Sequence, residues 1–196
     1  MNFLTVVLLA IVSVFGSNAQ TSPLIVDLGY ASYQGSFDSS TNVTNFFGVR
    51  YATPPLGESC ELRFRAPQPP ANVSGVQQAD TEPPECFQAG RGTSPTNPFS
   101  NQTLKRQSRE QTEDCLFVNV HLPGSSVPEE ALPTIVWIHG GGYLAGDASD
   151  YQGSDLINEA NGGVVVVTVQ YRLGVFGFLA GEKVKADGAL NAGLCQ

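Results

Sequence analysis

The chain has 196 residues, of which 41% are hydrophobic, which is enough for one domain with a core. Its 10 basic and 18 acidic residues give a net charge of −8, and the basic residues form no extended cluster. This distribution argues against a nucleic-acid-binding protein. Only 14% of the residues are charged, so we interpret the acidic balance as a contribution to solubility and not as a substrate preference.

The N-terminus has the pattern of a secretory signal. Residues 3–15 form an almost unbroken apolar run, and the small residues Ser17 and Ala19 fit a signal-peptidase site. Because a helix needs about 20 apolar residues to cross a bilayer, no stable membrane span is expected here. A buried N-terminal helix or strand is the alternative. We predict a signal peptide over residues 1–19, a mature domain from residue 20, and a secreted, extracellular protein.

Three N-glycosylation acceptor sequences agree with secretion. They begin at Asn42, Asn72 and Asn101, and each lies in or beside a polar stretch. We therefore expect the protein to be a glycoprotein.

The four cysteines would meet an oxidising environment outside the cell. Cys86 and Cys115 bracket a polar stretch without hydrophobic periodicity, and a bridge between them would stabilise the fold by about 3–4 kcal/mol. Cys60 and Cys195 have no evident partner. The chain has two histidines and no Cys-x-x-Cys pair, so we expect no zinc site.

The first half of the mature chain indicates strands and loops. Weak alternation over residues 24–34 suggests a short antiparallel hairpin, and residues 45–51 form a second partly apolar segment. Residues 66–111 are rich in Pro, Gln, Ser, Thr and Asn, so we interpret them as a surface loop and not as a separate domain.

The second half indicates an α/β fold. Residues 116–122, 134–138 and 164–169 read as strands, the last Val-rich as buried parallel strands are. A helix capped by Ser154 separates the last two strands, and Gly188 begins another helix. This order predicts a mostly parallel central sheet with helices on both faces.

A glycine cluster follows the strand at residues 134–138. His139 is followed by Gly140, Gly141 and Gly142, three consecutive residues without side chains. Glycine permits positive φ and close approach, and fixed N–H donors after a strand stabilise an oxyanion by about 3–4 kcal/mol each. An ordinary glycine turn is the alternative.

Six sequence blocks occur along the chain: residues 46–55 (F-F-G-V-R-Y-A-T-P-P), 62–67 (L-R-F-R-A-P), 113–120 (E-D-C-L-F-V-N-V), 139–143 (H-G-G-G-Y), 171–179 (Y-R-L-G-V-F-G-F-L) and 191–194 (N-A-G-L). Together they resemble the type-B carboxylesterase/lipase family, the cholinesterase-like branch of the α/β-hydrolases. The resemblance covers most of the mature chain, and the motifs occur in the family's order. Two positions depart from the pattern: Arg50, where proline is usual, and Gln196, where aspartate is expected.

The resemblance assigns roles to the residues of the glycine cluster. It implies that the N–H groups of Gly141 and Gly142 are oxyanion-hole donors and that His139 and Gly140 shape the turn. It also implies that Tyr143 and Leu144 lie near the substrate gorge. In the family the catalytic histidine follows the nucleophile, so His139 is interpreted as a loop-organising residue. His121, near Pro123, is interpreted as a surface or internally hydrogen-bonded histidine.

The resemblance also implies two structural pairs. It pairs Cys86 with Cys115, and it predicts an ion pair between Arg63 and Glu113 beside this disulfide. An exposed salt bridge that contributes little is the alternative.

The family's nucleophile sits in a G-x-S-x-G elbow, and no such elbow occurs in the chain; the nearest match, around Ser59, lacks the final glycine. We expect the Ser/Glu/His triad to lie beyond Gln196, so that residues 20–196 form a partial domain. The hypothesis is the N-terminal portion of a secreted carboxylic ester hydrolase, inactive by itself. The parent would act on a small-molecule or lipid ester without metal or organic cofactor. The alternative is a cholinesterase-like binding or adhesion protein without a working triad.

Two features predict poor folding of the chain in isolation. Arg172 would lack the aspartate that pairs with it in the family, and the strand at residues 164–169 would lack covering elements.

Overall fold

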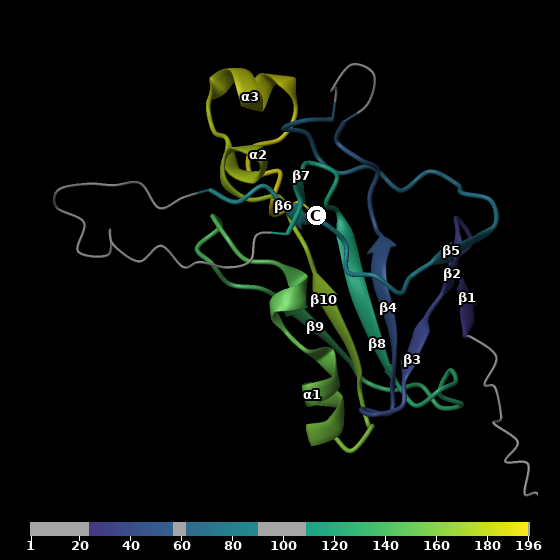
Figure 1. The fold of residues 1–196 in the computed structure, drawn as a ribbon. Coiled ribbons are helices and arrows are strands. Elements are labelled where there is room, and N and C mark those ends of the chain that lie inside the picture. Colours follow the sequence, from purple (N-terminus) through teal and green to yellow (C-terminus); the bar gives the residue numbers. More distant parts are fainter. Residues whose placement is uncertain (1–23, 57–61, 90–108, 196) are drawn as a thin grey trace, which may run out of the picture.

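The computed structural model describes residues 24–56, 62–89 and 109–195 (Figure 1). The predicted signal peptide, Cys60 and Asn101 therefore lie outside the described residues. The strands are β1 Ile25–Asp27, β2 Ser32–Gln34, β3 Ser36–Asp38, β4 Val43–Arg50, β5 Val76–Gln78, β6 Glu85–Cys86, β7 Gln111–Thr112, β8 Phe117–Pro123, β9 Thr134–Ile138 and β10 Val165–Val169. The helices are a 3₁₀ turn at Ala148–Asp150, α1 Gly153–Glu159, α2 Gly174–Phe178 and α3 Glu182–Asp187.

The central sheet has five strands in the order β3-β4-β8-β10-β9. β9 and β10 are parallel, whereas the β3–β4, β4–β8 and β8–β10 pairs are antiparallel. In this part of the chain the sheet is thus mainly antiparallel, not mostly parallel as expected. The connections explain the difference, because a short turn joins β3 to β4 and allows only an antiparallel pair. The longer crossover through α1 permits the parallel β9–β10 pair.

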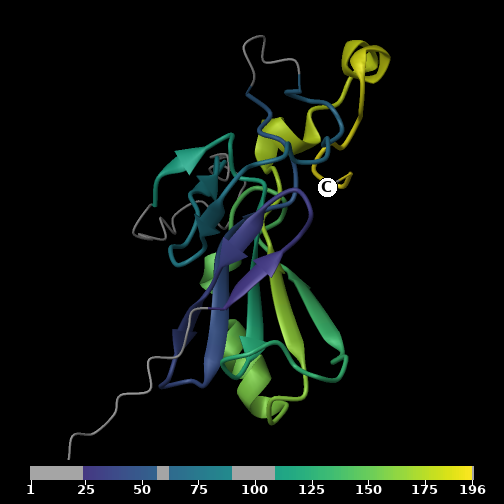
Figure 2. The ribbon, with the colours of Figure 1, turned by 90° about the vertical axis from the view of Figure 1, so that its right-hand side faces the viewer.

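Side-chain alternation along β8 gives the sheet two different faces. Val118, Val120 and Leu122 pack against a buried cluster that joins Tyr33 of the small β1-β2-β5 sheet to Phe46 and Val49 of β4. His121 points to the opposite face and meets Gly153 at the start of α1. Figure 2 shows α1 behind the central sheet and the β1–β2 hairpin in front of it. The expected helices on both faces are therefore replaced, over β4 and β8, by a helix on one face and a small sheet on the other.

The β9 edge of the sheet is open in the described part of the chain. All five residues of β9 are exposed, including Val136 at 58% and Ile138 at 67%. On the α1 side, Trp137 packs on Tyr151 with ring centroids 4.9 Å apart. An apolar strand in a parallel pair is normally buried on both faces of its sheet. The exposure of β9 therefore bears on whether the chain stays monomeric.

Several local predictions can be compared with the structure. The hairpin over residues 24–34 is confirmed as the antiparallel β1–β2 pair, and the strand at 134–138 is confirmed as β9. The predicted cap at Ser154 is wrong, because α1 begins at Gly153 and its N-cap, Gln152, makes no side-chain cap bond. A side chain at Gly153 would collide with the His121 ring, 2.2 Å from the Cβ position, so close packing fixes this helix start.

The helix predicted from Gly188 onward is also wrong. Gly188 is instead the C-cap of α3, and the described residues after it form turns. Glycine directly after a helix is more often a stop signal than a start, which is the physical reason for the error. Among the described residues, none of the helices is both long enough and apolar enough to cross a bilayer.

Candidate functional site

The glycine loop, defined here as residues 139–146, leaves the carboxyl end of β9 with an unusual backbone. Gly141, Gly142 and Gly146 have φ values of 122°, 65° and 110°. Tyr143, which is not glycine, also has a positive φ of 62°. Such a conformation is costly for a residue with a side chain and is often retained at functional sites.

Two glycines of this loop are required by close packing as well as by φ. A Cβ at Gly141 would lie 1.7 Å from the carbonyl oxygen of Ala145. A Cβ at Gly146 would lie 2.5 Å from Nδ1 of His139 and 2.6 Å from the carbonyl oxygen of Gly140. The two limbs of the loop therefore touch through their backbones, and larger residues at either position would separate them.

Gly141 and Gly142 lie at the surface of the glycine loop. Both residues are exposed, and within the described part of the chain neither N–H group donates a hydrogen bond. Next to them lies an open, largely apolar cavity of about 560 Å³. It is lined by Val136, Ile138 and Val169 of the sheet, by His139, Gly140, Gly142 and Tyr143 of the loop, and by Tyr171, Gly193 and Leu194.

Tyr143 and Leu144, both expected near a substrate gorge, differ in their position relative to the cavity. Tyr143 lines the cavity and packs on Phe178, with ring centroids 4.9 Å apart. Leu144 is not among the residues that line this cavity; its carbonyl oxygen instead accepts a 2.7 Å bond from the Ala89 N–H. This arrangement gives Tyr143 the position nearer to a ligand.

His139 is held inside the loop. It is 3% exposed, its Nδ1 lies 2.8 Å from the carbonyl oxygen of Gly140, and its ring stacks on Tyr171 at 4.5 Å. The Tyr171 hydroxyl donates to the His139 carbonyl oxygen at 3.0 Å. Burial raises the pKa of Tyr171 and so further favours the protonated hydroxyl that donates this bond. These contacts support a loop-organising role for His139.

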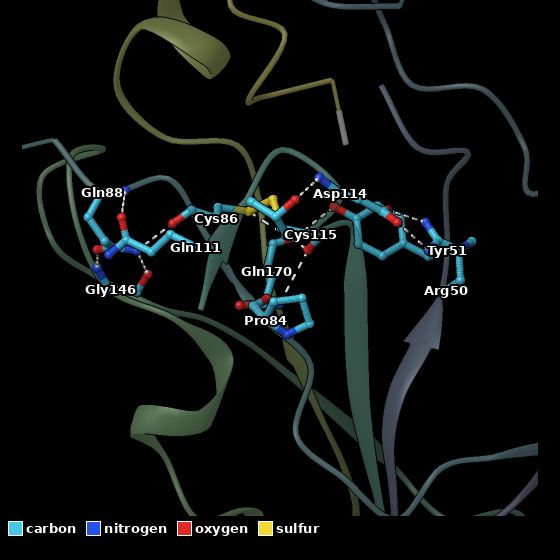
Figure 3. The surroundings of a disulfide bond; sticks show 11 residues. Arg50, Tyr51, Pro84, Cys86, Gln88, Gln111, Asp114, Cys115, Gly146 and Gln170 are labelled. Atoms are coloured by element: carbon cyan, nitrogen blue, oxygen red, sulfur yellow. Dashed lines mark hydrogen bonds and ion pairs between the residues drawn. A yellow bond between two sulfur atoms is a disulfide. The ribbon is translucent and has the colours of Figure 1, made fainter. Parts of the chain in front are cut away.

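A disulfide joins Cys86 to Cys115, as the resemblance implied (Figure 3). Gln170, at the end of β10, donates from Nε2 to the carbonyl oxygens of Pro84 at 3.0 Å and Cys115 at 3.3 Å. The disulfide is buried in a cluster with Ala52, Leu116, Tyr171 and Leu173. Cys195 is exposed and forms no disulfide within the described residues.

Two ion pairs flank this disulfide. Arg63 contacts Glu113 through two nitrogens, and its Nε lies 2.7 Å from Oε2. Arg50, at the position where the family has proline, binds both carboxylate oxygens of Asp114 at 2.6 and 2.9 Å. Its guanidinium also lies 4.4 Å from the centre of the Phe117 ring. The departure at Arg50 thus adds a second clamp beside the disulfide.

Arg172 has backbone partners in this structure. It is 3% exposed and donates to the carbonyl oxygens of Leu62 at 3.3 Å, Arg65 at 2.7 Å and Ala192 at 3.4 Å. Burial lowers its pKa from the ordinary value. The expectation that Arg172 loses its partner therefore overlooked the backbone carbonyls that gather around it.

Two other sets of residues concern binding and modification. Asn42 and Asn72, the two acceptor residues that the structure describes, are both exposed. No group of three or more His, Cys, Asp or Glu side chains suited to a metal ion occurs among the described residues.

Sequence reasoning missed one residue that contacts the glycine loop. The side chain of Gln88 binds Gly146, and the only sequence signal for this contact was a polar residue two positions after a bridged cysteine.

Known proteins are similar to this chain in sequence and in overall fold. The model of the carboxylesterase family matches residues 23–195. The chain belongs to the carboxylesterase family. The resemblance inferred from the motifs is confirmed. This carboxylesterase-family chain is 39% identical to rat (Rattus norvegicus) liver carboxylesterase 1F over 184 residues, which is 92% of this chain and 32% of the rat protein.

Two further relatives agree. The chain is 44% identical over 158 residues, 79% of its length and 27% of the relative's, to a medium-chain fatty acyl-CoA hydrolase precursor of Anas platyrhynchos. The crystal structure of Aspergillus niger EstA superposes with a TM-score of 0.73 at 38% identity, covering 89% of this chain and 30% of that one. The α/β class is thereby confirmed, and the carboxylesterase-family chain spans about a third of the length of these proteins.

Proposed function

We propose that this chain carries the oxyanion-binding part of the active site of a carboxylic ester hydrolase. The observation that supports this most is that Gly141 and Gly142 are exposed, that their N–H groups donate no hydrogen bond within the described residues, and that Gly142 lines an apolar cavity. Ester hydrolysis passes through a tetrahedral intermediate with a negatively charged oxygen, and preorganised N–H donors lower its energy. The apolar walls suit the acyl or alcohol part of a small-molecule or lipid ester.

The remaining chemistry requires groups that these 196 residues do not contain. We infer a serine acyl-enzyme mechanism in which the serine attacks, a histidine acts as base and then acid, and an acidic residue orients it. The chain has no G-x-S-x-G elbow, so the 196 residues by themselves are expected to be inactive. The elbow's own N–H would complete the oxyanion hole.

The test compares the 196-residue chain with the complete product of its gene. We expect a fluorophosphonate probe to label only a product that contains the elbow serine, and p-nitrophenyl esters to be hydrolysed by that product alone. Labelling of the 196-residue chain would contradict the proposal. A longer product that binds esters without hydrolysing them would favour the alternative, a cholinesterase-like binding protein.

The contribution of the glycine loop can be measured in the same active product. Gly142→Ala should lower kcat by about a hundredfold with little change in KM, because the added Cβ is strained at φ 65° and displaces the donor. Gly75→Ala is the matched control, since Gly75 has φ 79° and equally open surroundings but lies in a distant turn. Equal kcat values for the two variants would show that the loop does not bind the oxyanion.

We also propose that residues 1–19 direct the chain into the secretory pathway and that it is glycosylated at Asn42, Asn72 and Asn101. The Cys86–Cys115 disulfide and the exposure of Asn42 and Asn72 support this. Treatment of culture supernatant with a glycosidase that removes N-glycans should lower the apparent mass of the product. Retention inside the cell, or an unchanged mass, would contradict it.

A further inference from the structure

The side chain of Gln88 binds both backbone groups of one residue in the glycine loop. Its Oε1 accepts a 2.7 Å bond from the Gly146 N–H, and its Nε2 donates to the Gly146 carbonyl oxygen at 3.1 Å (Figure 3). The same Nε2 donates to the carbonyl oxygen of Cys86 at 2.9 Å. The Gln88 carboxamide therefore satisfies the backbone N–H and C=O of Gly146, as a paired β-strand would do.

Gln88 is itself fixed on the side away from the loop. It lies two residues after Cys86, which the disulfide ties to Cys115. Its backbone N–H donates to Oε1 of Gln111 at 3.3 Å, and the next N–H, that of Ala89, donates to the Leu144 carbonyl oxygen at 2.7 Å. The disulfide and these two hydrogen bonds therefore fix the segment from which Gln88 contacts Gly146.

The clamped residue touches the part of the loop that precedes the oxyanion donors. The Cβ position of Gly146 lies 2.5 Å from His139 Nδ1 and 2.6 Å from the Gly140 carbonyl oxygen. Because these contacts leave no free space, a displacement of Gly146 would be passed directly to His139 and Gly140. Gly141 follows at once, and its own Cβ position lies 1.7 Å from the Ala145 carbonyl oxygen.

We propose that Gln88 is a positioning residue for the oxyanion loop, holding Gly146 so that the N–H groups of Gly141 and Gly142 keep the orientation that oxyanion binding requires. The disulfide at Cys86 supplies the rigid support for this contact. The inference rests on the proposed function, because it assigns the glycine loop the oxyanion role. It predicts that loss of the carboxamide loosens the loop while the sheet keeps its stability.

The experiment measures amide hydrogen exchange by mass spectrometry on the secreted protein. In Gln88→Met, which keeps the side-chain length but removes the donor and acceptor, exchange of residues 139–147 should rise about tenfold. Exchange over β8 and β10 should stay at the wild-type value. Gln77→Met is the matched control, because within the described residues the Gln77 Nε2, on β5, donates to the nearby carbonyl oxygens of Ser74 and Gly75 and not to the glycine loop.

A second variant gives a signature that loss of packing would not produce. In Gln88→Glu, the ionised carboxylate faces the carbonyl oxygens of Gly146 and Cys86 and should loosen the loop at pH 7. Once protonated, the carboxyl group presents one donor and one acceptor, which can restore both bonds to Gly146 but not the additional donation to Cys86. Exchange of the loop, corrected for the intrinsic effect of pH, should return toward the wild-type value at pH 5.

Unchanged loop exchange in Gln88→Met, or an equal rise over the loop and β8, would overturn the positioning role. In an active product, Gln88→Met should lower kcat at least tenfold with KM within about twofold; an unchanged kcat would also overturn it. If the loop loosens as expected but no form of the protein hydrolyses esters, the positioning role stands and the proposed function fails.

Discussion

Burial of His121 links the protonation of one side chain to the stability of the sheet. His121 is 4% exposed on the α1 face, where its Nδ1 lies 2.6 Å from Oδ1 of Asn45. Within the described residues its Nε2 has no hydrogen-bond partner. Burial lowers the pKa of His121 to about 4. Of the two interpretations of His121, the surface position is wrong, because it is buried within β8; the internal hydrogen bond to Asn45 agrees with the other.

We predict that His121 makes the protein less stable in acid. Because its folded pKa is about 4 and its unfolded pKa is about 6.5, the unfolded state binds more protons between these values. The free energy of unfolding should therefore fall by about 3 kcal/mol as the pH falls from 7 to 4. Urea denaturation at low protein concentration measures this, and His121→Gln supplies the control without a titrating group. Parallel pH profiles for the two proteins would disprove the link.

Adjacent residues before β8 form ion pairs with different burial. Glu113 is 8% exposed and pairs with Arg63, whereas the side chain of Asp114, which pairs with Arg50, is 36% exposed. Water screens the more exposed pair, so its loss costs less than loss of the buried one. Both pairs connect the start of β8 to segments that come before the disulfide in the chain.

The two pairs predict an order of mutational effects. Glu113→Gln should lower the free energy of unfolding by about 2 kcal/mol, because it leaves the Arg63 charge without its carboxylate. Asp114→Asn should cost less than about 1 kcal/mol, since Arg50 keeps its contact with Phe117 and its access to solvent. Urea denaturation of both variants tests the order. Equal costs would mean that burial does not set the strength of these pairs.

At the scale of the whole molecule, the open β9 edge dominates. Val136 and Ile138 expose more than half of their surface on one face, and they border the cavity beside the glycine loop. An apolar strand with a free edge is a template for pairing with another chain. We therefore attribute the expected poor folding and self-association of the isolated chain to the exposed strand β9.

We predict that residues 20–196 self-associate through β9 and that Val136→Lys reduces this. The lysine places a charge on the free strand, which opposes edge pairing. Sedimentation velocity should show fewer oligomers for Val136→Lys than for the unaltered chain. Val127→Lys is the control, because Val127 is 55% exposed but lies outside the sheet. A soluble, monomeric, cooperatively melting unaltered chain would contradict the prediction, as would equal effects of both substitutions.

Sequence reasoning succeeded where the deciding forces are local. The apolar run of β9 and the alternation of the β1–β2 hairpin follow from hydrophobic periodicity, and the glycine loop follows from the conformational freedom that glycine alone provides. The family followed from motifs spread along the chain and is confirmed by the match over residues 23–195. Each of these features can be identified without knowing what lies beside it in space.

Only the tertiary structure decided the contacts between distant segments. Long-range packing buries His121 against Gly153, surrounds Arg172 with carbonyl oxygens and brings Gln88 to Gly146. Only the tertiary structure also decided the antiparallel direction of the β4–β8 and β8–β10 pairs, because strand direction depends on which strand edges meet. The sequence by itself determined the family, the strand at residues 134–138 and the glycine loop. Which side chain holds that loop in place depends on a fold that brings residues 88 and 146 together, and local pattern carries no record of such a contact.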